Sequence, residues 1–221
     1  MNNNLYQELK DKKIDHLIID LRNNEGGSEH QAIELMSYLS VQPYKLYEHI
    51  FLSHLDYRPL KDYIIERDSI DLVFNNDDQY MRRFSHNLWI NNYKYSKSLR
   101  LQNPKENVFK GQIYVLGNGL SFSSAADLAA SIIKTTDAVY IGEETGGAFE
   151  GPSGGASIVI QLPNSKIMVR ISPNIHLSYL YKKHPFGRGL LPDYPIQYSV
   201  EDHLNGRDLE MEKALELINK D

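Results

Sequence analysis

The stretch GNGLSFSSAAD, residues 117–127, joins a strand-like apolar pattern to a helix-like one and carries three serines. Before it, the run IYVL is typical of a buried strand. After it, apolar side chains recur with the period of one helix face, at Ala125, Leu128, Ala129, Ile132 and Ile133. A helix needs only one small polar residue at its start, so the extra serines raise the question of whether one of them has a chemical role.

Capping is the simpler interpretation of Ser121, Ser123 and Ser124, because serine hydroxyls accept hydrogen bonds from the unpaired N–H groups at a helix start. Ser124 with Asp127 makes a suitable capping arrangement. The alternative is that one serine is a nucleophile, since a helix N-terminus offers N–H donors and a positive dipole end to a forming oxyanion. Such a serine also needs a base and a second oxyanion donor. This turn alone leaves both interpretations open.

A second glycine-bearing turn, NNEGG at residues 23–27, follows the apolar run HLIIDL. Its backbone N–H groups at Gly26 and Gly27 are candidates for the second oxyanion donor if both turns face one cleft. The simpler interpretation is that the two glycines only permit positive φ in a tight turn. Ser28 and Gln31 then resemble a capping box that opens the next helix.

Strand-like and helix-like patterns alternate along most of the chain, which favours an α/β fold with a mainly parallel sheet. Ligands of such sheets usually bind at loops that follow strand ends, where both glycine turns fall. Residues 54–108 interrupt the alternation, and we interpret them as an insertion or lid with some helix. The segments 156–162 and 166–172 predict a hairpin. A final helix from about residue 208 is expected to bury Met211, Ala214, Leu215 and Ile218.

The composition narrows the class of protein. The 221-residue chain is 41% hydrophobic and has a net charge of −5, which gives no reason to expect nucleic acid or an anionic membrane as partner. No apolar run approaches the roughly 20 residues that a membrane span needs. The first residues lack the apolar stretch of a secretory signal, so the sequence as written carries no export signal and defines no compartment. Cysteine is absent, which excludes disulfides and a cysteine nucleophile.

Four motifs occur in order along the chain: HLIIDLRNNEGG, YVLGNGLSFSSAADLAASI, AVYIGEETGG and GRGLLPDYPI. Together they resemble the signatures of the tail-specific, or C-terminal processing, serine protease family, which includes the tricorn core protease. The resemblance spans roughly residues 14–218 and leaves 54–108 unmatched. Each motif is unspecific alone, whereas four in the same order are specific.

The resemblance implies a single serine peptidase domain over residues 1–221, with the Clp protease/crotonase-like spiralled sheet of ββα units. It implies that Ser123 is the nucleophile and that the backbone of Ser124, Gly26 and Gly27 forms the oxyanion hole. The implied substrate is a peptide or an unfolded protein tail, bound as an added strand and cut near its C-terminus. The sequence leaves a homo-oligomer open. Members of the family commonly work outside the cytoplasm.

The general base is where this sequence departs from the family. One branch carries a lysine 25 positions after the serine, and here that position is Ala148. The tricorn-like branch uses a histidine from a segment upstream of the first motif, so we expect that part of the family domain to be absent from this chain. The accessory glutamate ahead of the last motif has no match in KKHPFGRG. Within the chain, the candidate bases are His30, His176 and His184.

Neither a cofactor nor a metal is expected. The histidines lack metal-ligand spacing with a further ligand nearby, and GNG and TGG lack the glycine spacing of nucleotide sites.

Two other functions stay open. One is a domain of the same fold that binds peptides without cleaving them. The other is a crotonase-like acyl-CoA enzyme, which would use a similar oxyanion hole but has no need of a serine nucleophile.

Overall fold

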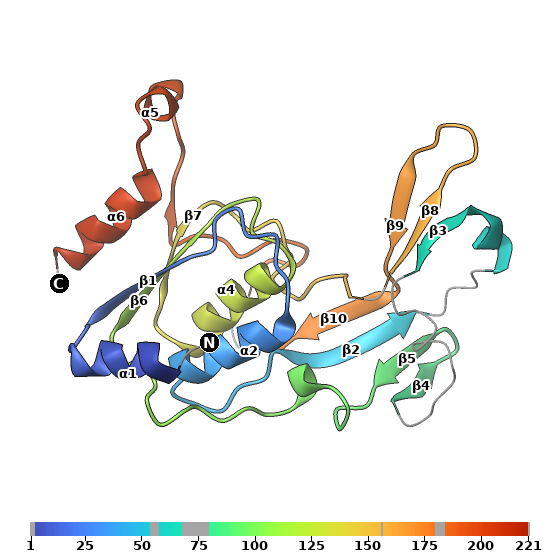
Figure 1. Ribbon diagram of the computed structural model, residues 1–221, viewed down its shortest axis with the longest axis horizontal. Helices are drawn as coiled ribbons and strands as arrows, with labels where there is room; N and C mark the ends of the chain where they lie inside the picture. Colours follow the sequence, from blue (N-terminus) through green and yellow to red (C-terminus); the bar gives the residue numbers. More distant parts are fainter. Residues whose placement is uncertain (1–2, 54–57, 68–79, 156, 180–183, 221) are drawn as a thin grey trace. The chain divides into compact units, whose positions relative to one another are not determined.

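The chain divides into two units, each described here by itself (Figure 1). The computed structural model describes residues 3–53, 58–67, 80–155, 157–179 and 184–220. Unit 1 comprises residues 1–46, 101–150 and 179–221, and unit 2 comprises residues 47–100 and 151–178. All four motifs of the sequence analysis fall in unit 1.

Unit 1 is built on a parallel sheet, as the alternating pattern predicts. Its strands are ordered β1 (His16–Asp20), β6 (Gln112–Gly117), β7 (Val139–Gly142) and β11 (Tyr194–Pro195). Every neighbouring pair in this order is parallel. The carboxyl ends of the strands therefore lie at one edge of the sheet, where open α/β sheets place their ligands.

Helices cover both faces of this sheet. The helices of unit 1 are α1 (Asn3–Asp11), α2 (Glu29–Leu39), α4 (Ser123–Thr135), α5 (Val200–Leu204) and α6 (Leu209–Ile218).

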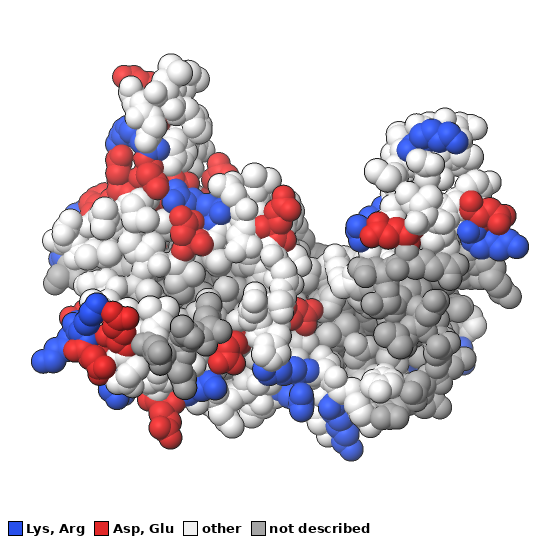
Figure 2. Space-filling model, viewed as in Figure 1, with Lys and Arg blue, Asp and Glu red and all other residues white. Residues whose placement is uncertain are grey.

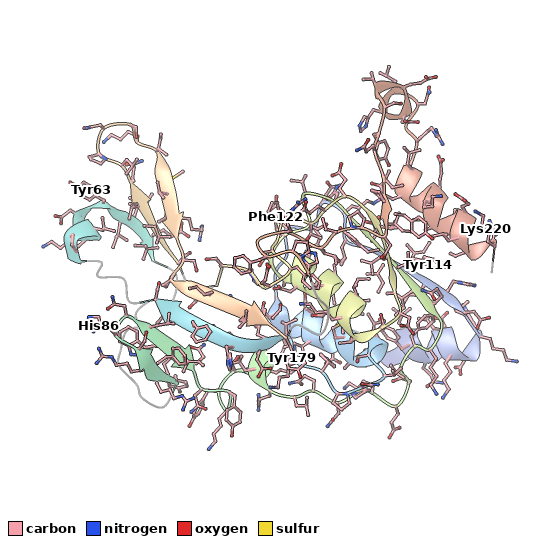
Figure 3. The ribbon with its side chains drawn as sticks, turned by 180° about the vertical axis from the view of Figure 1, so that it is seen from behind. Tyr63, His86, Tyr114, Phe122, Tyr179 and Lys220 are labelled. Carbon is pink, nitrogen blue, oxygen red and sulfur yellow. The ribbon has the colours of Figure 1, made fainter. Side chains whose placement is uncertain are left out.

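Side chains alternate along β6 between two separate apolar clusters. Ile113 and Val115 belong to the cluster formed with α2 and α4, whereas Tyr114 and Leu116 belong to the cluster formed with α6. Figure 3 labels Tyr114 on the α6 side. Because successive side chains of a strand point to opposite faces, α2 and α4 cover one face and α6 covers the other.

The apolar periodicity of α4 is confirmed, but that of α6 is partly wrong. Ala214 is fully buried as expected, and Met211 and Ile218 pack beside it. Leu215 is 47% exposed, and Leu217 packs against the sheet in its place. The capping box at the start of α2 is also wrong, because Ser28 takes the N-cap position but makes no side-chain cap hydrogen bond.

Unit 2 consists of antiparallel strands. One sheet has the order β10 (Asn174–Ser178), β2 (Tyr47–Ser53), β5 (Leu88–Asn91) and β4 (Met81–Ser85). The other has the order β3 (Ile64–Arg67), β8 (Ile158–Gln161) and β9 (Met168–Ile171), and β8 with β9 is the predicted hairpin.

The region 54–108 is expected from its sequence to hold some helix. Its described part contains strands and two 3-10 helices, η1 (Arg58–Tyr63) and η2 (Lys97–Leu99), rather than an α-helix. Residues 54–57 and 68–79 lie outside the described residues. Across the described ranges, none of the helices has the length and apolar character that crossing a membrane requires.

Candidate active site

Three loops meet at the carboxyl edge of the unit 1 sheet. The loop at residues 21–28 follows β1, that at 118–122 follows β6, and that at 143–149 follows β7. Figure 3 labels Phe122 among these loops, beside α4. Each loop includes part of one of the sequence motifs. The sheet therefore brings together three motifs that lie far apart in the chain.

Ser121 links the first two loops. Its hydroxyl donates a hydrogen bond of 2.8 Å to the carbonyl oxygen of Leu21 and accepts one of 3.1 Å from the N–H of Asn118. Its side chain is fully buried. Ser121 therefore holds the loops in place and is not available to a substrate.

A pair of asparagines adds further links between the same loops. The Asn118 carbonyl Oδ1 accepts the N–H of Asn23, and the Asn118 amide Nδ2 donates to Asn23 Oδ1, both at 3.1 Å. The N–H of Phe122 donates to the carbonyl oxygen of Asn24 at 3.0 Å. Asn23, Asn24 and Asn118 are therefore positioning residues. The sequence shows them as NN and GNG in the two turns but does not indicate this role.

Ser123 is the exposed serine of the turn. It is the first residue of α4 and has a φ of +49°, whereas Ser124 is buried. The predicted capping by Ser124 is wrong, because the N-cap residue is Phe122 and no side chain caps this end of the helix. A non-glycine residue in the left-handed region costs roughly 1–3 kcal/mol and is common at functional sites.

The glycine turn lies directly against Ser123. A Cβ added to Gly26 would stand 2.7 Å from the Cβ of Ser123 and 3.0 Å from the amide nitrogen of Ser124. Only glycine allows this approach, and the φ of +100° at Gly26 also favours it. The glycine turn and the serine turn are thus in direct contact.

Among the described residues, the N–H groups of the residues that follow Gly26 and Ser123 in the chain are unbonded. The N–H of Gly26 donates to Asn24 Oδ1 at 3.0 Å. Within the described residues, the N–H groups of Gly27 and Ser124 have no hydrogen-bond partner. The space where a Cβ of Gly27 would lie is open to at least 4 Å. These two groups, one from each turn, are therefore the candidate oxyanion donors.

The third loop packs on the start of α4. A Cβ on Gly147 would stand 2.6 Å from the Cβ of Ala126 and 3.5 Å from the nitrogen of Ser123. The N–H of Thr145 donates to the carbonyl oxygen of Leu190 at 3.1 Å, and the Leu190 N–H donates to Thr145 Oγ1 at 2.8 Å. The GEETGG and GRGLLPD motifs are thereby joined in one structure.

A carboxylate strengthens this junction. Glu144 accepts hydrogen bonds of 2.8 Å from the Nε of Arg188 and from the N–H of Gly189. Hydrogen bonding to Arg188 lowers the pKa of Glu144 to about 2. The charge of Glu144 therefore persists at neutral pH and holds the 187–190 turn.

None of the candidate histidines is bonded to the serine. The Oγ of Ser123 makes no hydrogen bond with any described residue. His30 lies exposed in the first turn of α2. His184 stacks on Phe149 with ring centroids 4.1 Å apart. His176 is a buried residue of β10 in unit 2, with its Nδ1 3.1 Å from the carbonyl oxygen of Pro152.

The lysine position of the family offers no base either. Ala148 forms an isolated bridge with Gly189. Burial lowers the pKa of Lys134 to about 8, but its Nζ donates to the carbonyl oxygen of Phe149 at 3.1 Å. Lys134 is 11 residues beyond Ser123 on α4, about 16 Å along the helix axis at its usual rise. Across the described ranges, no group of three or more His, Cys, Asp or Glu residues is arranged to hold a metal ion.

An exposed serine with positive φ between a strand end and a helix, facing a glycine turn, is typical of enzymes that use serine as a nucleophile. The comparison with protein families agrees, because the model of peptidase family S41 matches residues 2–195. The chain belongs to this family of serine peptidases, and the resemblance drawn from the four motifs is confirmed. Its fold is the ClpP/crotonase-like α/β fold, as the family predicts. No curated protein matches the sequence significantly.

Several solved structures share the fold. A candidate peptidase from Parabacteroides merdae is 22% identical, with a TM-score of 0.60 over 97% of this chain and 56% of its own. A candidate S41 protease from Bacteroides fragilis is 16% identical, with a TM-score of 0.51 over 98% and 48%. Mature CPAF in complex with lactacystin is 17% identical, with a TM-score of 0.54 over 98% and 45%. The chain thus spans about half the length of these proteins.

Proposed function

We propose that the two units form one serine peptidase domain in which Ser123 attacks the carbonyl carbon of a peptide bond. One observation carries the proposal. Of the three serines in the turn, Ser123 is the exposed one, it has the unusual positive φ, and Gly26 packs against it. Ser121 is tied to the backbone of two loops and Ser124 is buried, so neither competes for this role.

The proposed reaction is acyl transfer. The Oγ of Ser123 bonds to the carbonyl carbon, and its proton passes to a general base. The carbonyl oxygen becomes an oxyanion that the N–H groups of Gly27 and Ser124 stabilise, assisted by the positive end of α4. The base then returns the proton to the leaving amine, and water hydrolyses the acyl-enzyme. Loss of one such donor typically costs about 10²–10³ in rate.

Family membership supports a peptide as the substrate. The proposed substrate is an unfolded protein tail, bound in extended form and cleaved near its C-terminus. The acyl-CoA alternative loses support, because that chemistry does not need a serine nucleophile. The non-cleaving peptide-binding alternative is favoured by one observation, namely that the Ser123 Oγ lacks a hydrogen-bond partner within the described residues.

A fluorophosphonate probe, with mass spectrometry of the labelled peptide, tests the nucleophile. We expect one adduct, on Ser123, that disappears in Ser123→Ala and persists in Ser124→Ala as the matched control. An adduct on Ser121 or Ser124 would refute the assignment. A folded protein that the probe does not label, even after long incubation, would favour the non-cleaving alternative or the lack of a base for Ser123.

A further inference from the structure

Arg22 belongs to the first motif, HLIIDLRNNEGG. It joins the start of the glycine turn to the C-terminal helix, α6. It lies two residues beyond the end of β1, and its side chain is only 17% exposed. Its guanidinium donates to both carboxylate oxygens of Asp20, at 3.0 and 2.7 Å. It also donates to both oxygens of Asp208, at 2.6 and 3.0 Å, and to Glu210 at 3.1 Å. One planar cation therefore connects three carboxylates.

The two acidic partners beyond Asp20 belong to the start of α6. The Oδ1 of Asp208 also accepts the N–H of Met211 at 3.0 Å and so caps the helix. Glu210 is 4% exposed and accepts a second hydrogen bond from the hydroxyl of Tyr198. That hydroxyl accepts the N–H of Leu209 at 2.9 Å. A buried carboxylate is costly unless it is paired, so Glu210 depends on Arg22 and Tyr198.

Helix α6 is itself fixed to the sheet by Ala214 and its apolar neighbours, which pack on β6 and β7. The acidic partners of Arg22 at the start of α6 are therefore held against the sheet. On the other side, the chain runs from Arg22 through Asn23, bonded to Asn118, to the glycines beside Ser123. The match to the family ends at residue 195, so α6 lies beyond it.

We propose that Arg22 is a positioning residue, through which α6 fixes the loop that carries Gly26 and Gly27 against Ser123. The proposal rests on the proposed function for its catalytic consequence, but not for its structural one. A misplacement of about 1 Å in a catalytic group can cost roughly 10²-fold in rate, so an anchor at the base of this loop has a large effect on chemistry.

Hydrogen exchange and probe labelling test the proposal on the whole 221-residue chain. In Arg22→Gln we expect amide exchange at Asn23, Asn24 and Gly26, whose N–H groups are hydrogen-bonded, to rise at least about tenfold, because local opening there loses its anchor. We expect the rate of fluorophosphonate labelling at Ser123 to fall roughly 10²-fold in protein that remains folded. Arg22→Lys keeps the charge but not the planar guanidinium. It should therefore restore only part of the protection from exchange and only part of the labelling rate.

Arg207→Gln is the matched control. Arg207 pairs with Asp202 and Glu212 in the same C-terminal segment, and Figure 2 shows the mixed acidic and basic side chains there. Its loss should leave exchange at the same three amides and labelling unchanged. Equal effects of both changes, or an Arg22→Gln protein with unaltered exchange at these amides, would overturn the proposal. Rapid exchange in Arg22→Gln with no labelling even in the unaltered chain would retain the anchor and remove only its proposed catalytic consequence.

Discussion

At the scale of single residues, the three serines of the turn have different environments and should respond differently to removal of their hydroxyls. Ser121→Ala leaves the partly buried N–H of Asn118 without this partner and removes one hydrogen bond from the Leu21 carbonyl oxygen. We expect a loss of about 1–3 kcal/mol in the free energy of unfolding. Ser124→Ala removes a hydroxyl that makes no hydrogen bond among the described residues, and we expect a change within about 0.5 kcal/mol.

Urea unfolding of both variants measures the difference. Ser123→Ala serves as the control for an exposed hydroxyl in the same turn. It relieves no positive φ, and we expect its stability to stay within about 0.5 kcal/mol of the unaltered chain. A Ser124→Ala protein that is less stable than Ser121→Ala would contradict the assignment of Ser121 as the residue that ties the loops.

The sequence predicted which residues would meet but not how each would act. Serine is common both at helix caps and as a nucleophile, and its residue type does not separate the two. The two roles are distinguished by the burial and the φ of each serine. Both depend on the fold, which brings Leu21 and Gly26 to the 118–124 segment. The role of Arg22 was not predictable from the sequence either, because Asp208 and Glu210, its partners, lie 186 and 188 residues away in the chain.

At the scale of elements, Glu144 connects the loop after β7 to the 187–190 turn, and this connection should depend on pH. Its pKa in the folded chain is lowered to about 2 from the ordinary 4.5. The stabilisation is therefore complete above pH 4.5 and is lost as the pH falls towards 2. We expect Glu144→Gln to lower the Tm at pH 7 by at most roughly 2–4 °C, because partly exposed pairs contribute about 0–1 kcal/mol.

Thermal unfolding of the two proteins at several pH values checks this. The difference in Tm should shrink progressively below pH 4.5. Glu201→Gln, an exposed residue of α5 that makes no ion pair with the described residues, should show no such difference at pH 7. A Tm difference for Glu144→Gln that grows on acidification would show that the carboxylate does not stabilise the turn.

Elements with a strong period were predictable, and short or atypical ones were not. The parallel strands, α4 and the β8–β9 hairpin follow from patterns that are long or clearly bounded. Helix α5 has five residues, none of them buried, so it carries no apolar period. In α6 the 3.6-residue pattern fits either Leu215 or Leu217 at one edge of the buried stripe, and in the structure it is Leu217 that packs against the sheet.

At the scale of the whole molecule, the missing element is a base for Ser123. A neutral hydroxyl is a weak nucleophile and needs a base within hydrogen-bond reach. Among the described residues of unit 1, none is hydrogen-bonded to the Ser123 hydroxyl, and Ala148 stands at the lysine position of the family. We therefore expect residues 1–221 alone to hydrolyse peptides slowly, at the roughly 10³–10⁴-fold enhancement over water that an oxyanion hole and binding can supply without a complete triad.

Two measurements decide where the base resides. Imidazole added to the 221-residue chain should raise kcat/KM on peptides with apolar C-termini, since a small base can take the place of an absent side chain, and Ser123→Ala should show no such rise. Where the reading frame continues upstream, an extended chain should gain several orders of magnitude in kcat/KM without imidazole. Rapid turnover by the 221 residues alone, abolished by changing His30, His176 or His184, would instead place the base inside this chain. If that base is His30 or His184, the loops around Ser123 would have to rearrange on substrate binding, because neither makes a hydrogen bond with the Ser123 hydroxyl in the structure.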